Sequence, residues 1–133
     1  MLRQLEDCGR HMDTGVLGAR VLFHVLSDFG YTDLALEVML NPTEPSYGVW
    51  ARRGETTLCE DLIDENGSVN SRNHHFFGDI SSWFIQSLAG IRYNPFRNNW
   101  KEVHIAPRFA KSISWAEGFH ICPRGRILSL IHI

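Results

Sequence analysis

The sequence has few cysteines, little net charge and no long apolar run. Its three cysteines, Cys8, Cys59 and Cys122, are odd in number and far apart, so they predict neither a disulfide framework nor a zinc knuckle, and they leave the cellular compartment open. The formal net charge of -2 provides no basic field that would attract nucleic acid or anionic lipid. No segment approaches the roughly 18 apolar residues of a membrane span. We therefore expect no nucleic acid and no membrane as a partner.

The composition that is present is that of an average globular protein. Hydrophobic residues make up 44% and charged residues 21% of the chain, which argues against disorder and against a fibrous repeat. With 133 residues the chain is long enough for one ordinary domain or for parts of two.

Helical periodicity dominates the first two thirds of the sequence. Apolar residues recur at helical spacing over residues 16–29, and Gly30 supplies a C-terminal stop. Thr32 can cap a second helix, which ends before Pro42, so the two helices predict a tight αα-hairpin. A third helix is predicted over roughly 75–89.

The remaining segments have other patterns. Residues 41–72 are interrupted by proline and glycine and predict a long loop, a feature that is often functional when ordered. Alternation of the β type appears at 102–106 and 112–116, and a third strand is predicted from 125 towards 131. Three helices and three strands close neither a helical barrel nor a sandwich. We therefore expect that both parts are truncated.

Side chains suited to a sugar site are concentrated in the long loop and just after it. Residues 54–61 and 70–78 hold carboxylates, an amide, imidazoles and aromatic rings within about twenty-five positions. Acids can transfer protons, polar groups can bind hydroxyls, and flat rings can stack on the C–H faces of a sugar. This combination makes carbohydrate chemistry a hypothesis.

Three short motifs then follow the order of a known family. They are Pro-Ser-Tyr-Gly at 45–48, Gly-Glu-Thr-Thr-Leu-Cys-Glu at 54–60 and Asn-His at 73–74. The series resembles Pro-Ser-Trp-Gly, Gly-Ala-Thr-Thr-Leu-Trp-Glu and Asn-His of glycoside hydrolase family 78, the bacterial and fungal α-L-rhamnosidases. The resemblance implies a mainly α fold, with residues 1–92 forming the last part of an (α/α)6 barrel of the six-hairpin glycosidase type. Residues 93–133 would then begin a C-terminal β-sandwich.

The resemblance also implies a function, an inverting hydrolysis of terminal α-L-rhamnosyl residues from glycosides or polysaccharides. In such a reaction one acid protonates the leaving oxygen while a carboxylate, roughly 6.5–9.5 Å away, activates water on the opposite face. Glu60 falls on the position of the general base, and His74 and Asn73 fall on sugar-binding positions. The general acid of the family lies earlier in the domain. We therefore expect a fragment that is inactive alone and needs the rest of the parent chain.

The chain departs from the family motifs at three positions. Tyr47 replaces a tryptophan but keeps a ring, Glu55 replaces an alanine and adds a second acid, and Cys59 replaces a tryptophan and removes aromatic bulk. Tyr47 and Trp50 could stack on a 6-deoxy sugar, and as core residues they would look the same in sequence. Both interpretations stay open.

The sequence predicts neither a metal site nor a cysteine nucleophile. The pair His74-His75 with Glu60 lacks the His-Glu-x-x-His spacing, so no metal and no other cofactor is expected. Cys59 has no motif that pairs it with a base, so it is not predicted as a nucleophile.

The sequence is also compatible with two other functions. The alternatives are another (α/α)6 glycosidase or glycoside phosphorylase acting on a different sugar, and a non-catalytic carbohydrate-binding module.

Residues 124–133 end in an apolar run that resembles a translated adapter sequence. We expect this tail to be non-native and assign it no function.

Overall fold

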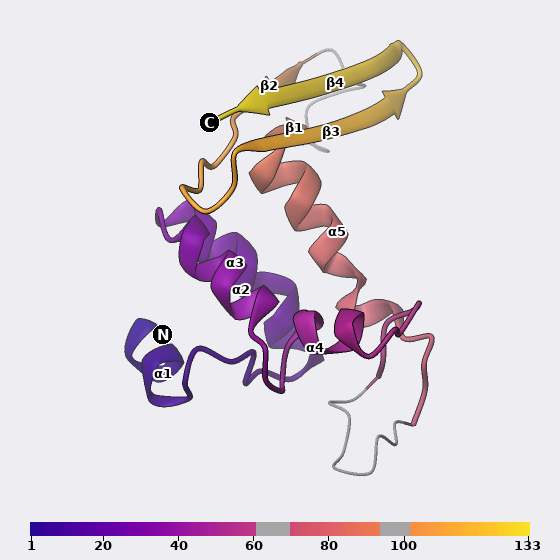
Figure 1. The fold of residues 1–133 in the computed structure, drawn as a ribbon. Coiled ribbons are helices and arrows are strands. Elements are labelled where there is room, and N and C mark those ends of the chain that lie inside the picture. The colour runs from indigo at the N-terminus through magenta and orange to yellow at the C-terminus, as the bar shows by residue number, and fades with distance from the viewer. Residues whose placement is uncertain (61–69, 94–101) are drawn as a thin grey trace.

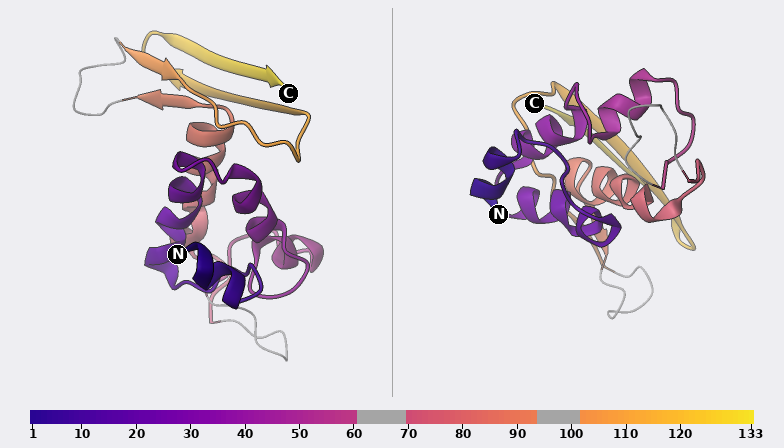
Figure 2. Two further views of the ribbon diagram at one scale, coloured as in Figure 1. Left: turned by 90° about the vertical axis from the view of Figure 1, so that its left-hand side faces the viewer. Right: turned by 90° about the horizontal axis from the view of Figure 1, so that it is seen from below.

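The computed structural model describes residues 1–60, 70–93 and 102–133. A helical part lies below two small antiparallel sheets, which cross the end of the helices (Figures 1 and 2). In the described residues, no helix is long and apolar enough to cross a membrane. In chain order the elements are α1 (Leu2–Asp7), α2 (Val16–Asp28), α3 (Thr32–Leu40), α4 (Tyr47–Arg52), η1 (His75–Gly78), α5 (Asp79–Trp83), η2 (Phe84–Leu88), β1 (Ile91–Tyr93), β2 (Val103–Ile105), β3 (Trp115–Cys122) and β4 (Gly125–His132).

Helices α2 and α3 form the predicted hairpin. Helix α2 ends because Gly30 adopts a φ of 85°, a left-handed conformation that glycine enters without steric cost. The Gly30 and Tyr31 N–H groups then donate to the carbonyls of Ser27 and Leu26. The predicted cap at Thr32 is wrong: Tyr31 occupies the N-cap position without a side-chain hydrogen bond, and Thr32 is buried.

The third predicted helix is present as a continuous series of η1, α5 and η2, in which η2 is a π-helical turn. It packs across α2 through Trp83, which is fully buried. The Trp83 ring lies 5.6 Å from that of Phe23, and its Nε1–H donates to Ser27 Oγ at 2.8 Å. This contact forms the centre of the helical core.

Two short helices were not predicted. Helix α4 lies within the segment that was expected to be loop, and Ser46 caps it by accepting a hydrogen bond from the Val49 N–H. Helix α1, which precedes the predicted hairpin, was missed as well. Each has only six residues, which is too short for helical periodicity to be recognised.

The strands agree only in part with the predictions. Strands β2 and β4 occupy the predicted segments, whereas β1 was missed and the strand expected at 112–116 begins only at Trp115. The reason is a tertiary contact: the Asp33 carboxylate accepts hydrogen bonds from the N–H groups of Lys111 and Ser112. These bonds hold that segment against the helical hairpin, so it cannot join a strand.

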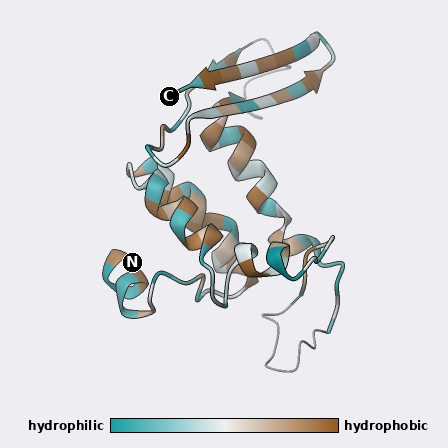
Figure 3. Cartoon of the chain, in the orientation of Figure 1, coloured by the Kyte–Doolittle hydropathy of each residue, from teal (hydrophilic) through white to brown (hydrophobic). Residues whose placement is uncertain are grey.

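The hairpin of β3 and β4 has one face on the helices and one face outward. Ser129, on the inner face, is buried, and its hydroxyl donates to the Ala89 carbonyl at 2.7 Å. The register pairs Phe119 with Leu128, so these residues share the opposite face. Five apolar side chains share that outer face and remain exposed: Trp115, Phe119, Ile121, Leu128 and Leu130. Figure 3 shows that hydrophobic and hydrophilic residues alternate along both strands.

Ion pairs join the two parts of the molecule. Asp28, at the end of α2, contacts Arg92 at 3.0 Å and Arg108 at 3.1 Å. Although burial alone would raise the pKa of Asp28, the hydrogen bonds from the two guanidinium groups bring it below its usual value. The Arg108 N–H also donates to the Ser87 carbonyl. Arg108 therefore contacts both the end of α2, through Asp28, and η2, through Ser87.

Gly90 is a position where we expect a substitution to destabilise the fold. It has a φ of 72°, and a Cβ placed there would lie 2.2 Å from the Pro107 nitrogen. Gly30 has a similar φ of 85° but no heavy atom within 4 Å of such a Cβ. Gly30→Ala should cost about 1–2 kcal/mol from backbone strain alone. Gly90→Ala should cost about 1–3 kcal/mol more, because the backbone must move away.

Urea unfolding of both variants measures this difference. Equal free energies of unfolding for Gly30→Ala and Gly90→Ala would contradict the close approach at Gly90.

Candidate functional site

The candidate site is built by two segments that follow α4, residues 55–60 and 70–74, which we call the first limb and the second limb. The Glu60 N–H donates to the Ser71 carbonyl, and the His74 N–H donates to the Leu58 carbonyl, each at 2.8 Å. The Thr57 hydroxyl donates to the Arg72 carbonyl. The paired position on the second limb rises from 71 to 74 as the position on the first limb falls from 60 to 58. The two limbs are therefore antiparallel.

This pairing brings Glu60 and His74 together. The Glu60 Oε1 lies 3.9 Å from the His74 Nδ1, and the two side chains are 38% and 21% exposed. The separation is longer than a hydrogen bond, so each group can still bind a third partner such as water or a sugar hydroxyl. A carboxylate and an imidazole that both reach solvent can accept a proton and orient a hydroxyl.

Asn73 lies on the second limb between Arg72 and His74. Its backbone N–H donates to Ser71 Oγ at 3.2 Å, which shapes the turn before His74. The residue is exposed. Its role in binding sugar stays a prediction.

Trp50 is buried in the core, and Tyr47 is half-buried against it; both rings lie beside Phe77. Trp50 is only 3% exposed, and its ring centroid lies 5.3 Å from that of Phe77. The Tyr47 hydroxyl donates to the Phe77 carbonyl at 2.8 Å, and burial raises its pKa. Both residues line an apolar cavity of about 340 Å³, and neither Glu60 nor His74 is among its lining residues. Both rings contact the core, and stacking of either ring on a sugar stays a prediction.

Cys59 lies next to Glu60 and is fully buried. Burial raises the pKa of its thiol, so the thiol stays protonated and is a poor nucleophile. The side chain of Cys59 is part of the buried apolar core.

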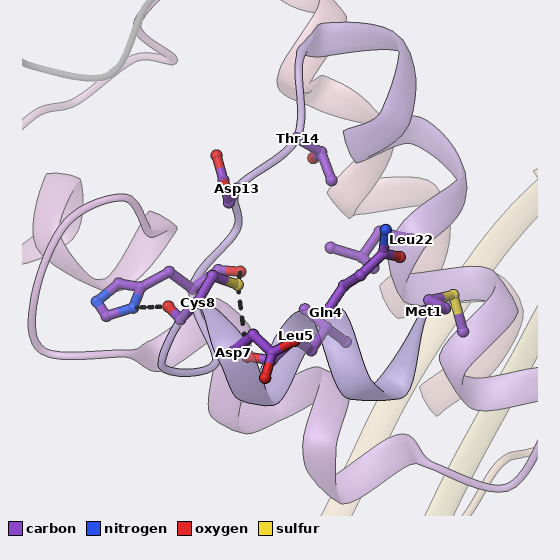
Figure 4. Close-up of a pocket in the computed structure, with 9 residues that line it drawn as sticks. Met1, Gln4, Leu5, Asp7, Cys8, Asp13, Thr14 and Leu22 are labelled. Carbon is purple, nitrogen blue, oxygen red and sulfur yellow. Dashed lines mark hydrogen bonds between the residues drawn. The ribbon is translucent and has the colours of Figure 1, made fainter.

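A second cavity, of about 550 Å³, lies between α1, the segment before α2 and Leu22 of α2 (Figure 4). No site was predicted there from the sequence. The Cys8 thiol donates to the Leu5 carbonyl at 3.4 Å, and the His11 Nδ1 lies 2.8 Å from the Cys8 carbonyl oxygen, so both side chains are engaged locally. Within the part of the chain that the structure describes, no group of three or more His, Cys, Asp or Glu side chains could hold a metal ion.

Comparison with known proteins identifies both parts of the chain. Residues 1–88 match the model of the bacterial alpha-L-rhamnosidase 6 hairpin glycosidase domain, and residues 90–131 match that of the bacterial alpha-L-rhamnosidase C-terminal domain. The second match includes most of β4 and so most of the segment 124–133. Together the matches confirm the predicted fold class, although the barrel is not complete in this chain.

Similar proteins and solved structures point to the same family as the two models. The chain is 32% identical over 134 residues to an alpha-L-rhamnosidase of Alteromonas sp. (strain LOR), covering 96% of this chain and 14% of the relative. It is 37% identical over 105 residues to one of Streptomyces avermitilis, covering 74% of this chain and 10% of the relative. The crystal structure of the Streptomyces avermitilis alpha-L-rhamnosidase complexed with L-rhamnose matches with a TM-score of 0.84 at 29% identity, covering 99% of this chain and 13% of that one.

A structure from Dictyoglumus thermophilum, also an alpha-L-rhamnosidase, matches with a TM-score of 0.81 at 28% identity and covers 93% of this chain and 14% of that one. The chain therefore spans only a small share of the length of the proteins that it resembles. Both of its parts, the helices and the strands, match the same kind of enzyme. The chain belongs to the bacterial α-L-rhamnosidase family.

Proposed function

We propose that this chain is the segment of an inverting α-L-rhamnosidase that supplies the catalytic base. The enzyme would hydrolyse terminal α-L-rhamnosyl residues of glycosides or polysaccharides. The observation that carries the proposal is the Glu60–His74 pair, held at 3.9 Å on two paired limbs and accessible to solvent. It occurs in a chain that belongs to the α-L-rhamnosidase family, and a relative's structure contains L-rhamnose.

In the proposed mechanism the ionised Glu60 removes a proton from a water molecule. The water oxygen attacks the anomeric carbon, and the bond from that carbon to the leaving oxygen breaks. A general acid on the opposite side of the sugar protonates the leaving oxygen. His74 and Asn73 hold sugar hydroxyls, which orients the ring for attack. Because water enters from the face opposite the leaving group, the anomeric configuration inverts.

The general acid would come from the part of the enzyme outside this segment. A base and an acid about 6.5–9.5 Å apart would leave room for the water molecule. We therefore propose that the 133-residue chain alone does not turn over substrate. The predicted partners are the rest of the parent enzyme and a rhamnose-containing substrate.

Activity of the full-length enzyme tests the proposal. We expect hydrolysis of aryl α-L-rhamnosides and little of aryl α-L-fucosides, with β-L-rhamnose as the first product in proton NMR. Release of the α-anomer first would contradict inversion. A preference for fucosides would indicate another glycosidase of the same fold, and dependence on inorganic phosphate would indicate a phosphorylase.

A further inference from the structure

Glu55 is the acid that replaces alanine in the motif leading to Glu60, and the structure gives it a partner. The Arg72 Nε lies 3.3 Å from Glu55 Oε1 and 3.1 Å from Glu55 Oε2. The side chain of Glu55 is only 17% exposed, whereas that of Arg72 is 55% exposed. The carboxylate is therefore partly desolvated, so its ion pair matters more than one on an open surface.

The ion pair connects the two limbs that carry the candidate site. Glu55 begins the first limb, and Arg72 lies on the second limb between Ser71 and His74. The Ser71 carbonyl accepts the Glu60 N–H, and the Arg72 carbonyl accepts the Thr57 hydroxyl. Arg72 thus joins the first limb through both its side chain and its backbone. A shift of Arg72 would move its neighbours, including His74.

We propose that Glu55 and Arg72 are positioning residues, which keep Glu60 and His74 at their working separation. The inference rests on the proposed function, because it assigns the pair a role at that site. Removing Arg72 would leave a partly buried carboxylate without its charge partner, and the first limb would move to bring Glu55 into water. Since proton removal by Glu60 depends on its distance from the attacking water, a small displacement slows the chemical step.

Single substitutions and a charge swap in the full-length enzyme test this role. We expect Arg72→Ala and Glu55→Ala each to lower kcat about three- to tenfold, with KM for an aryl α-L-rhamnoside within about twofold. Arg72→Lys keeps the charge and should retain most of the activity. The double variant Glu55→Arg with Arg72→Glu should recover kcat to within about twofold of the unmodified enzyme. The thermal unfolding midpoint should stay unchanged in all four.

The matched control is the ion pair between Glu44 and Arg53, which lies beside α4 and does not join the two limbs. The double variant Glu44→Arg with Arg53→Glu should leave kcat and KM unchanged.

The outcomes separate this inference from the proposed function. An enzyme that does not cleave rhamnosides, or that keeps full activity with Glu60→Gln, would refute the proposed function and the inference with it. Where both of those tests succeed, unchanged kcat in Arg72→Ala would overturn the positioning role alone. So would a charge swap that fails to recover activity, or a fall in the thermal midpoint that accompanies the loss of kcat in both single variants.

Discussion

Replacing Glu60 by glutamine in the full-length enzyme should lower kcat by about 10²–10⁴-fold, the usual contribution of a positioned general base. Glutamine keeps the size of the side chain but cannot accept a proton from water. KM should change by less than about threefold, because substrate binding does not require proton transfer. Steady-state kinetics on an aryl α-L-rhamnoside measures both constants.

Two further variants test whether the effect of Glu60→Gln is specific to the site. Glu117→Gln, a change of the same chemistry at an exposed position on β3, should leave kcat and KM unchanged. His74→Ala removes a proposed contact to a sugar hydroxyl, so it should raise KM more than Glu60→Gln does. Near-normal turnover in Glu60→Gln would refute the assignment of the base.

Trp83→Ala should destabilise the helical part by about 3–5 kcal/mol, the range found when large aromatic side chains are removed from a core. Trp83, the last residue of α5, is fully buried where α5 packs on α2, so truncation leaves a cavity in a close-packed core. The variant also leaves Ser27 without the Nε1–H that donates to it at 2.8 Å. Urea unfolding of the full-length enzyme, followed by circular dichroism, measures the change.

Ser27→Ala separates the hydrogen bond from the packing. It leaves the buried Nε1–H of Trp83 without an acceptor, at a cost of about 1–3 kcal/mol. Trp83→Phe keeps most of the apolar volume and should be intermediate between the two. A Trp83→Ala variant that is no less stable than Ser27→Ala would contradict the central place of this ring in the core.

The longer helices could be predicted from the sequence because each carries its own signal. Apolar residues recur at helical spacing in α2, and Gly30 ends it because only glycine enters a φ of 85° at no steric cost. The six-residue helices α1 and α4 have no such signal, since fewer than two turns contain no recognisable period. Segment 112–114 reads as a strand, but hydrogen bonds from Lys111 and Ser112 to Asp33 hold this region elsewhere.

The candidate site, too, could be predicted from the sequence only in part. The order of the motifs, with Glu60 after Thr-Thr-Leu and His74 after Asn73, pointed to a base and a sugar ligand. The sequence could not distinguish a stacking ring from a core ring at Tyr47 and Trp50, because burial depends on the neighbours that α4 meets after folding. In the structure both rings pack against Phe77.

The amino-acid sequence by itself determined the family, the longer helices and the residue types of the site, since each of these is written in local spacing and motif order. Only the tertiary structure decided that Glu60 and His74 lie within 3.9 Å and that Glu55 pairs with Arg72. These contacts join residues at least fourteen positions apart. They depend on how the two limbs pair across space, which no local pattern encodes.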